Sequence, residues 1–381
     1  MSEAVVPATP IAVTEAQLED LRGRLHAARW PDELPDARGV WGPPMDRLRQ
    51  LCTHWAEGYD WRKTERQFNQ WPSYETRIEG QRVHFFWIRS GRPGAIPLLL
   101  THGWPGSVAE FLDIVGPLTE PDHHGAPGEI AFDVVMPSLP GYGWSGPTGT
   151  SGWDLWRIAK AWRELMRRLG YRRYAAQGGD FGSMVSARLA LLAPDELLGL
   201  HLNMALVPRR PGSIAPNEQA DLDEVVDFVK NGSAYQVIHA RSSQTLGYGL
   251  NDSPIGLAAW ILDKFDRWTD SPSNALHTIS ADRLLDNIML YWVTETVNSS
   301  MRLYAEASLK NDLGPTHEKV SVPTGVVVFP REMFRFPRSW IERAFNLVHY
   351  RRMPRGGHFA AMEVPDLLVE DIRIFFSHLS R

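Results

Sequence analysis

The pentapeptide at residues 178–182, Gly-Gly-Asp-Phe-Gly, constrains the fold of this chain more than any other feature. It lies between an apolar, strand-like run at 174–177 and an amphipathic helical pattern that begins near Gly182. A glycine-flanked aspartate also fits an ordinary Asx-turn. In this context, however, the spacing is typical of a nucleophile elbow, a sharp strand-to-helix turn that exposes one side chain above a sheet. The pattern therefore predicts an α/β fold with a nucleophile at Asp180.

An aspartate at the elbow determines the chemistry that we expect. Serine at this position leads to direct hydrolysis of esters. A carboxylate instead attacks an sp3 carbon by displacement and leaves an ester on the enzyme, which a second step must hydrolyse. The residue type at position 180 therefore favours strained ethers or alkyl halides as substrates.

Two further motifs follow predicted buried strands. Residues 96–100 form an apolar run that ends in His102, Gly103, Trp104 and Pro105, a loop able to offer a backbone N–H. Near the C-terminus, residues 347–353 read as a strand that leads into a glycine pair and His358. Nucleophile, acid and then histidine is the chain order of α/β hydrolases, so His358 falls where that fold needs a base.

Together these motifs resemble the α/β-hydrolase-fold epoxide hydrolases, in particular the microsomal and juvenile-hormone-type branch with its extra N-terminal region. The matching stretches are spread over most of the chain. They are HGWPGSVAEF (102–111), PSLPGYGWSG (137–146), GGDFGS (178–183), YWVTETVNSSMRLY (291–304), VPTGVVVFPREMF (322–334) and RGGHFAAMEVPDLL (355–368). Bacterial members of this branch include detoxifying and secondary-metabolite enzymes.

The resemblance implies a role for each catalytic position. Asp180 is the expected nucleophile, and His358 is the expected general base, since an unperturbed pKa of about 6.5 suits a base near neutrality. The family pattern places the acid that orients the histidine at Glu332. Asp312 is the reserve candidate, because some α/β hydrolases supply this acid from another strand end.

Opening an epoxide also requires a proton for the ring oxygen, which a phenol can supply. By resemblance, Tyr304 is one cap tyrosine, and Tyr235 matches the second through a shorter segment. We expect the backbone N–H groups of Trp104 and Phe181 to form the oxyanion hole. The resemblance also implies a cis peptide bond before Pro105.

The remaining site predictions concern the substrate pocket and the cofactor. No cofactor or metal is expected, and the substrate is expected to be a small, apolar or aromatic epoxide. The predicted pocket residues are His102, Trp104, Pro105, Phe181, Trp144, Trp292 and Phe359.

The pattern of predicted elements divides the chain into three regions. Residues 1–75 read as a helical and extended segment that packs on the core, with Trp30, Trp41, Trp55, Trp61 and Trp71 as packing residues. Strand-like and helix-like runs then alternate, which predicts a mainly parallel sheet with helices on both faces. This α/β-hydrolase core comprises 76–207 and 314–381. Between its two parts, 208–313 is predicted to form a helical cap, with helices at 221–230, 253–268 and 284–309.

Composition restricts the cellular location and the binding partners that we expect for the protein. The formal net charge of −5 over 381 residues offers no basic face for nucleic acid. The single cysteine, Cys52, excludes an internal disulfide and is expected to be buried. No apolar run approaches the roughly 18 to 20 residues that span a bilayer, and the first residues do not resemble a signal peptide. We therefore expect a cytoplasmic enzyme with no membrane or nucleic-acid partner, and a homodimer on base rates alone.

Three other functions fit parts of the pattern. A haloalkane or haloacid dehalogenase shares the aspartate and the histidine, but it holds its halide with side-chain N–H donors, and Phe181 has none. A ligand-binding relative without activity would be expected to lack a catalytic residue, whereas every expected position is occupied. A metal site at His123 and His124 lacks further ligands at a suitable spacing.

Overall fold

The computed structural model describes residues 4–209, 214–271 and 274–379. Within these ranges nine strands form one sheet, in the order β1-β2-β3-β5-β4-β6-β7-β8-β9. The strands are β1 Val6–Pro7, β2 Ser73–Ile78, β3 Gln81–Ile88, β4 Ile96–Thr101, β5 Phe132–Pro137, β6 Tyr174–Gly178, β7 Leu197–Leu202, β8 Val320–Val328 and β9 Phe345–Arg352. From β5 to β9 the neighbouring strands are parallel, as the sequence predicts.

The register of the central strands brings two functional loops together. Thr101, at the end of β4, pairs with Gly178 of β6, and Gly178 also pairs with Leu202 of β7. The three strands therefore end at the same edge of the sheet. Because the loop that begins at His102 and the elbow at Asp180 both leave from this edge, they lie side by side.

An antiparallel hairpin extends the other side of the sheet. Its strands are β2 and β3, and β2, which was not predicted, crosses the boundary drawn at residue 75. The turn between the strands consists of Glu79 and Gly80, which both have positive φ angles, as a tight two-residue hairpin turn requires. The charged side chains within β2 obscure its strand character in the sequence.

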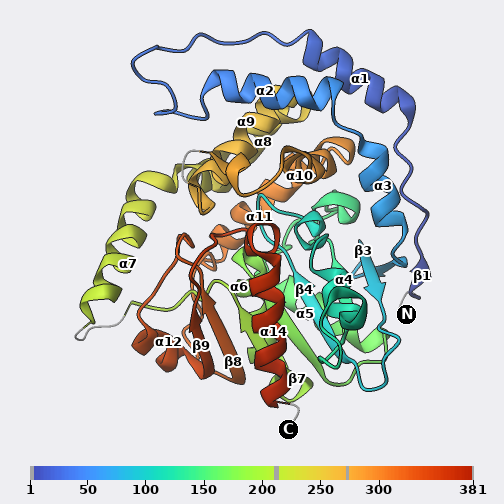
Figure 1. Ribbon diagram of the computed structural model, residues 1–381, viewed down its shortest axis with the longest axis vertical. Helices are drawn as coiled ribbons and strands as arrows, with labels where there is room; N and C mark the ends of the chain where they lie inside the picture. The colour runs from blue at the N-terminus through green and yellow to red at the C-terminus, as the bar shows by residue number, and fades with distance from the viewer. Residues whose placement is uncertain (1–3, 210–213, 272–273, 380–381) are drawn as a thin grey trace.

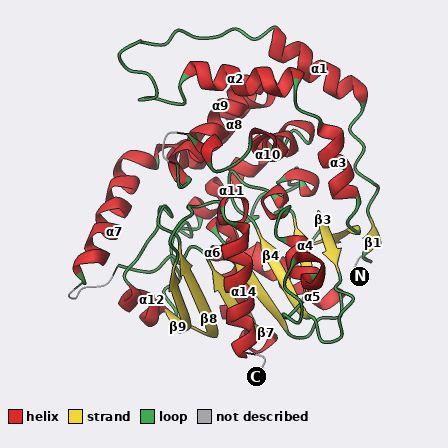
Figure 2. Ribbon diagram, viewed as in Figure 1, coloured by secondary structure: helices red, strands yellow, loops and turns green. Residues whose placement is uncertain are grey.

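Helices cover both faces of the sheet (Figure 2). On one face α14 crosses β7, and its Phe375 packs against Gly325, where a Cβ atom would lie 2.9 Å from the ring. Elsewhere α5 and α6 pack together, and α6 lies against β4, β6 and β8. The core helices are α4 Val115–Thr119, α5 Leu155–Arg168, α6 Asp180–Leu192, α12 Arg338–Ala344, α13 Ala360–Glu363 and α14 Pro365–Leu379, with short 3-10 turns η1 Val108–Phe111, η2 Pro121–His124, η3 Gly143–Ser145 and η4 Pro194–Glu196.

Between β7 and β8 the regular elements of the described residues are all helical, over the range where the sequence predicts a cap. Its elements are α7 Pro216–Asp227, the π-helical turn η5 Phe228–Gly232, α8 Ala234–Asp252, α9 Pro254–Trp268, the 3-10 turn η6 Ala275–His277, α10 Ala281–Val293 and α11 Val297–Leu309.

The prediction for the cap was wrong in two places. It omitted α8, whose polar and glycine-rich sequence has little helical pattern and whose backbone is kinked at Ser242. It also joined α10 and α11 into one helix, but the chain breaks between them at Glu295, which has a φ of 53°.

The N-terminal region holds α1 Glu15–His26, α2 Met45–Glu57 and α3 Trp61–Asn69. The region packs on both the cap and the sheet. Helices α1 and α2 contact α9 of the cap, whereas β1 pairs with β2, and Phe68 of α3 stacks on Phe86 of β3. Figure 1 shows this blue segment passing over the cap before α3 returns toward the sheet. Trp55 and Trp61 are buried as predicted, and so is Cys52. Trp41 is 79% exposed, so its predicted packing role is wrong: it lies in a segment without regular structure.

None of the helices in the described part of the chain combines the length and the apolar character needed to cross a bilayer.

Candidate active site

The turn at Asp180 has the geometry of a nucleophile elbow. Asp180 has a φ of 48°, an uncommon conformation for a residue with a side chain. Each flanking glycine meets a close neighbour: a Cβ atom on Gly182 would lie 1.8 Å from the carbonyl oxygen of Thr101, and one on Gly179 would lie 2.4 Å from Asn203. The glycines therefore allow a turn tight enough to raise Asp180 above the ends of β4 and β6.

The carboxylate of Asp180 is held on two sides. Its Oδ1 accepts a hydrogen bond of 2.8 Å from the backbone N–H of Trp104, in the loop after β4. Its Oδ2 lies 3.4 Å from Nε2 of His358. The side chain of Asp180 is 18% exposed, whereas that of His358 is almost fully buried.

His358 is oriented by Glu332. Nδ1 of the imidazole lies 2.8 Å from Oε2 of Glu332, and both side chains are buried. Glu332 follows β8 and is fixed in turn by the backbone N–H of Phe334, which donates to Oε1 at 3.2 Å. Asp180, His358 and Glu332 thus come from the ends of three parallel strands and form a continuous chain of contacts.

The surroundings of His358 act on its pKa in opposite directions. Burial disfavours the imidazolium and lowers the pKa, but the negative charges of Glu332 and Asp180 favour it more strongly. The net result is a pKa of His358 well above its ordinary value. The imidazolium is therefore stabilised for as long as both carboxylates are charged.

The reserve acid, Asp312, is engaged elsewhere. Both of its carboxylate oxygens accept hydrogen bonds from Nε of Arg188, at 3.1 Å each. The guanidinium of Arg188 is buried, so the pair forms a structural contact between α6 and the segment after α11. Of the two candidate acids, Glu332 is the one that contacts His358.

The two predicted tyrosines come together above Asp180. Tyr235 lies in the first turn of α8 and Tyr304 lies in α11; both are buried, and their ring centroids are 5.8 Å apart. Tyr235 stacks on Trp104 at 5.3 Å, and Tyr304 contacts Phe181 at 4.7 Å. Burial, together with the negative charge of Asp180, raises the pKa of both phenols, so each keeps its proton at neutral pH.

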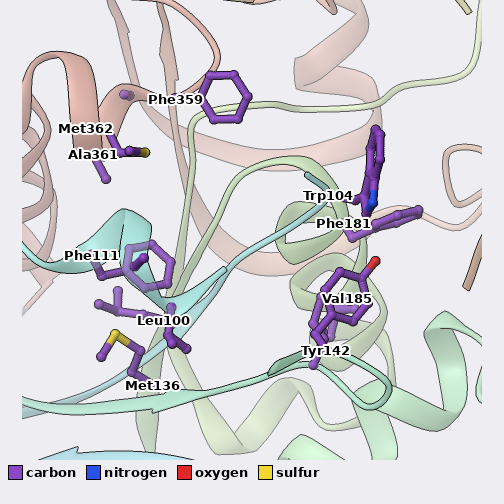
Figure 3. Close-up of a cluster of buried hydrophobic side chains, with 14 of the residues drawn as sticks. Leu100, Trp104, Phe111, Met136, Tyr142, Phe181, Val185, Phe359, Ala361 and Met362 are labelled. Atoms are coloured by element: carbon purple, nitrogen blue, oxygen red, sulfur yellow. The ribbon is translucent and has the colours of Figure 1, made fainter. Parts of the chain in front are cut away.

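Several predicted pocket residues lie at this site. The bond between Trp104 and Pro105 is cis. Trp104 and Phe181, both labelled in Figure 3, each contact Tyr304, with ring centroids 5.9 Å and 4.7 Å from its own. Phe359 packs face to face on Phe265 with centroids 3.8 Å apart. His102 borders the cavity beside Asp180, and burial lowers the pKa of its imidazole to about 4. His102 is therefore neutral, and its Nε2 accepts a hydrogen bond from the loop at Leu139.

Two predicted pocket residues lie elsewhere, so these predictions were wrong. Trp144 packs against Phe68 and Phe86, beneath α3. Trp292 meets Trp55 of α2 at 6.4 Å. In both cases the partners come from regions far away in the sequence.

Sequence reasoning missed two neighbours of the triad. Glu110 lies beside the cavity shared by Asp180 and His358, and burial raises the pKa of its carboxyl to about 8. Glu110 belongs to the stretch 102–111 that resembles the epoxide hydrolases, and this resemblance was the one sign in the sequence that could have identified it. Trp268, the last residue of α9, has its ring 5.3 Å from that of His358. Nothing in the residue pattern distinguishes this tryptophan from its neighbours.

The described ranges contain no group of three or more His, Cys, Asp or Glu side chains that would hold a metal ion. His123, one of the paired histidines in the sequence, is exposed beside Glu120.

Fold and site together define an α/β hydrolase with an aspartate, histidine and glutamate triad. Comparisons with known proteins agree: residues 96–236 match the alpha/beta hydrolase fold family, and residues 6–111 match the family described as the epoxide hydrolase N terminus. The chain belongs to the epoxide hydrolase family, and it is a hydrolase.

Similar proteins cover nearly the whole chain. A Stigmatella aurantiaca protein whose name places it among the epoxide hydrolases is 45% identical, over 97% of this chain and 84% of its own length. Epoxide hydrolase 1 of Sus scrofa is 38% identical, over 97% of this chain and 88% of its own. The crystal structure of juvenile hormone epoxide hydrolase from Bombyx mori has a TM-score of 0.91 and 32% identity, covering 99% of this chain and 95% of that one.

Proposed function

We propose that this protein converts an epoxide into a vicinal diol through a covalent ester on Asp180. The observation that carries this proposal is the position of the Asp180 carboxylate. It lies between the N–H of Trp104 and the imidazole of His358, close enough to the two cap tyrosines for its charge to raise the pKa of both phenols. A displacement reaction that leaves an enzyme-bound ester needs these groups.

In the first step, Oδ2 of Asp180 attacks an epoxide carbon and the carbon–oxygen bond of the ring breaks. Tyr304 and Tyr235 hold the ring oxygen and give it a proton, and the phenol that loses its proton recovers one from solvent. Oδ1 becomes the carbonyl oxygen of the ester, because it is the oxygen already bound by the N–H of Trp104.

In the second step, water attacks the ester carbon of Asp180 while His358 takes a proton from it. The N–H groups of Trp104 and Phe181 stabilise the negative charge that develops on Oδ1. The bond from the ester carbon to Oδ2 then breaks, and the diol leaves with the proton that His358 took. Glu332 keeps the imidazole in the tautomer that this transfer requires.

The charges at the site link the two steps. In the free enzyme, Asp180 and Glu332 both favour the imidazolium form of His358. Esterification neutralises Asp180, which removes one of these two charges and lowers the pKa of His358. The imidazolium then releases its proton to solvent, and the neutral histidine is available as a base once the ester is formed.

The division of the chain into regions has a function under this proposal. The core supplies the triad, the cap supplies the tyrosines, and the N-terminal region fixes the cap through α1 and α2. The aromatic side chains around Asp180 favour an epoxide with apolar or aromatic substituents. A homodimer and a cytoplasmic location remain predictions from the sequence.

A single turnover in water enriched in oxygen-18 tests the mechanism. With enzyme in excess over an aryl epoxide, the first diol should contain no label, because its new oxygen comes from Asp180. The label should appear in the peptide that contains Asp180. Label in the first diol and none in the protein would mean that water opens the epoxide directly.

A further inference from the structure

Two spaces of very different size lie near His358. One is the cavity of about 20 Å³ that Asp180, Glu110 and His358 border. The other, which we name the outer pocket, has a volume of about 490 Å³. It lies between residues 38–47, the η5 turn, the end of α9 and residues 331–335.

The cavity beside Asp180 is too small for an organic substrate. A single water molecule occupies roughly 10 to 15 Å³ on this measure, so about 20 Å³ holds one water. Toward the cap, Trp104 stacks on Tyr235, and Phe181 packs edge-on against Tyr304. The outer pocket, by contrast, falls within the range of roughly 300 to 1,000 Å³ that is typical of small-molecule sites.

Trp268 lies between the outer pocket and the catalytic residues. It lines the outer pocket together with Phe228, whose ring centroid is 6.2 Å from its own. On its other sides, the indole is 5.3 Å from the ring of His358 and 5.4 Å from that of Tyr235. Its backbone oxygen accepts a hydrogen bond of 2.9 Å from the backbone N–H of His358, which holds the two residues next to each other. Trp268 therefore borders both the outer pocket and the catalytic residues.

The outer pocket is lined by apolar and by charged side chains. Phe228, Trp268 and Met333 form its apolar wall. The charged lining residues are arginines and carboxylates, and many of these are paired, as buried Arg335 is with Glu224 and Arg267 is with Asp263. Such a pocket suits a ligand with an apolar or aromatic body and a polar far end.

The backbone beside this wall is irregular. Phe228 begins η5, a π-helical turn, and such turns occur frequently at functional sites. The ring of Phe228 lies against Gly232, where a Cβ atom would be 2.7 Å away. The apolar wall therefore depends on a local geometry that a regular α-helix would not give.

We propose that the outer pocket binds the substituent of the epoxide, that substrate reaches Asp180 from it, and that Trp268 determines which epoxides pass. The substrates are then epoxides with an extended apolar or aromatic substituent and a polar terminus. This inference rests on the proposed function.

A second pocket supplies a matched control. It has nearly the same volume, about 500 Å³, and shares Gly39, Gly42 and Pro43 with the outer pocket. It is lined by Leu34, Trp41 and Ile255 among others, and Trp268 does not border it. A block in this control pocket therefore leaves the proposed path open.

Cysteine labelling tests the path. The chain has one cysteine, Cys52, which is buried, so an introduced cysteine can be modified selectively. Asn231→Cys places a thiol in the outer pocket, and Leu34→Cys places one in the control pocket; each variant is assayed on an aryl epoxide before and after reaction with a bulky aromatic maleimide.

Labelling of Asn231→Cys should lower kcat/KM by about tenfold or more, and labelling of Leu34→Cys should change it by less than about twofold. An unchanged rate for labelled Asn231→Cys, or equal losses in both variants, would overturn the inference. Diol formation by the unlabelled variants tests the proposed function separately, so the two failures are distinguishable.

Trp268→Phe provides a second measurement on the same point. The smaller ring keeps an aromatic contact with His358 but leaves a gap toward the outer pocket. The ratio of kcat/KM for a bulky epoxide to that for a small one should rise by about tenfold. An unchanged ratio would show that Trp268 does not select the substrate.

Discussion

The carboxylate of Asp180 packs directly against the Cα atom of Gly103. A Cβ atom at residue 103 would lie 2.2 Å from Oδ1 of Asp180 and 2.4 Å from its Cβ. The same Oδ1 accepts the N–H of Trp104 at 2.8 Å. The absence of a side chain at residue 103 is therefore what lets the loop after β4 reach the nucleophile.

Gly103→Ala should inactivate the enzyme while leaving it folded. The added methyl group displaces the carboxylate from the N–H of Trp104, and a shift of about 1 Å at a reacting group costs roughly a hundredfold in rate. We expect kcat/KM for an aryl epoxide to fall by at least this factor. Gly23→Ala is the control: a Cβ there meets no atom within 4 Å, so activity should persist and stability should rise by about 0.5 to 1 kcal/mol. Full activity of Gly103→Ala would refute the account of this contact.

Glu332→Gln should slow the second step more than the first. The neutral amide removes a charge that raises the pKa of His358, and it no longer fixes the tautomer. We expect kcat to fall by roughly 10²- to 10⁴-fold, with the covalent intermediate accumulating during turnover. Rapid quenching followed by mass measurement of the protein checks this. Asp312→Asn is the matched variant: a larger loss of kcat there than in Glu332→Gln would assign the acid to Asp312 instead.

The two tyrosines should prove partly redundant. Tyr304→Phe and Tyr235→Phe each remove one phenol that can protonate the ring oxygen, and we expect each to slow formation of the ester by about 10- to 100-fold. The double variant should lose more than either single variant, but the effects need not add, because the rings are in contact. The rate of ester formation in single turnovers is the measurement. A double variant with wild-type rates would exclude both residues.

Glu110 gives the stability of the protein a dependence on pH. Burial raises its pKa from an ordinary 4.5 to about 8, so between these values the folded chain holds a proton that the unfolded chain has released. The free energy of unfolding therefore falls as pH rises through this window, by about 1.4 kcal/mol per pH unit for one such proton.

Glu110→Gln removes this contribution, because the amide does not titrate. The stability of the variant minus that of the wild type should grow as pH rises from 5.5 to 7.5, by about 1.4 kcal/mol per pH unit at most. Urea unfolding at three pH values measures the difference. If the difference stays constant across this range, Glu110 is not protonated in the folded protein.

The parts of the site that the sequence predicts best are those that local chain geometry determines. The glycines around Asp180 are needed within one turn, and His358 follows a strand and a glycine pair, so both can be recognised without knowledge of the rest of the fold. Glu332 and Tyr235 carry no such local signal, and the family resemblance was needed to propose them.

Contacts between distant segments determined what the sequence could not predict. Trp144 and Trp292 look like pocket residues until Phe68 and Trp55 are seen to cover them. Trp268 contacts His358 because the end of α9 and the loop that carries His358 come together in the fold. Helix α8 was missed because its stability comes from packing on α11 rather than from its own sequence.

The most direct measurement is the intact mass of His358→Gln after exposure to a panel of aryl and alkyl epoxides, followed by peptide mapping. Without the base, ester hydrolysis should stall, and the protein should gain the whole mass of one epoxide on the peptide that contains Asp180. The double variant with Asp180→Ala should gain nothing. An adduct on another peptide, or no adduct from an epoxide that the wild type converts to diol, would contradict a covalent Asp180 ester.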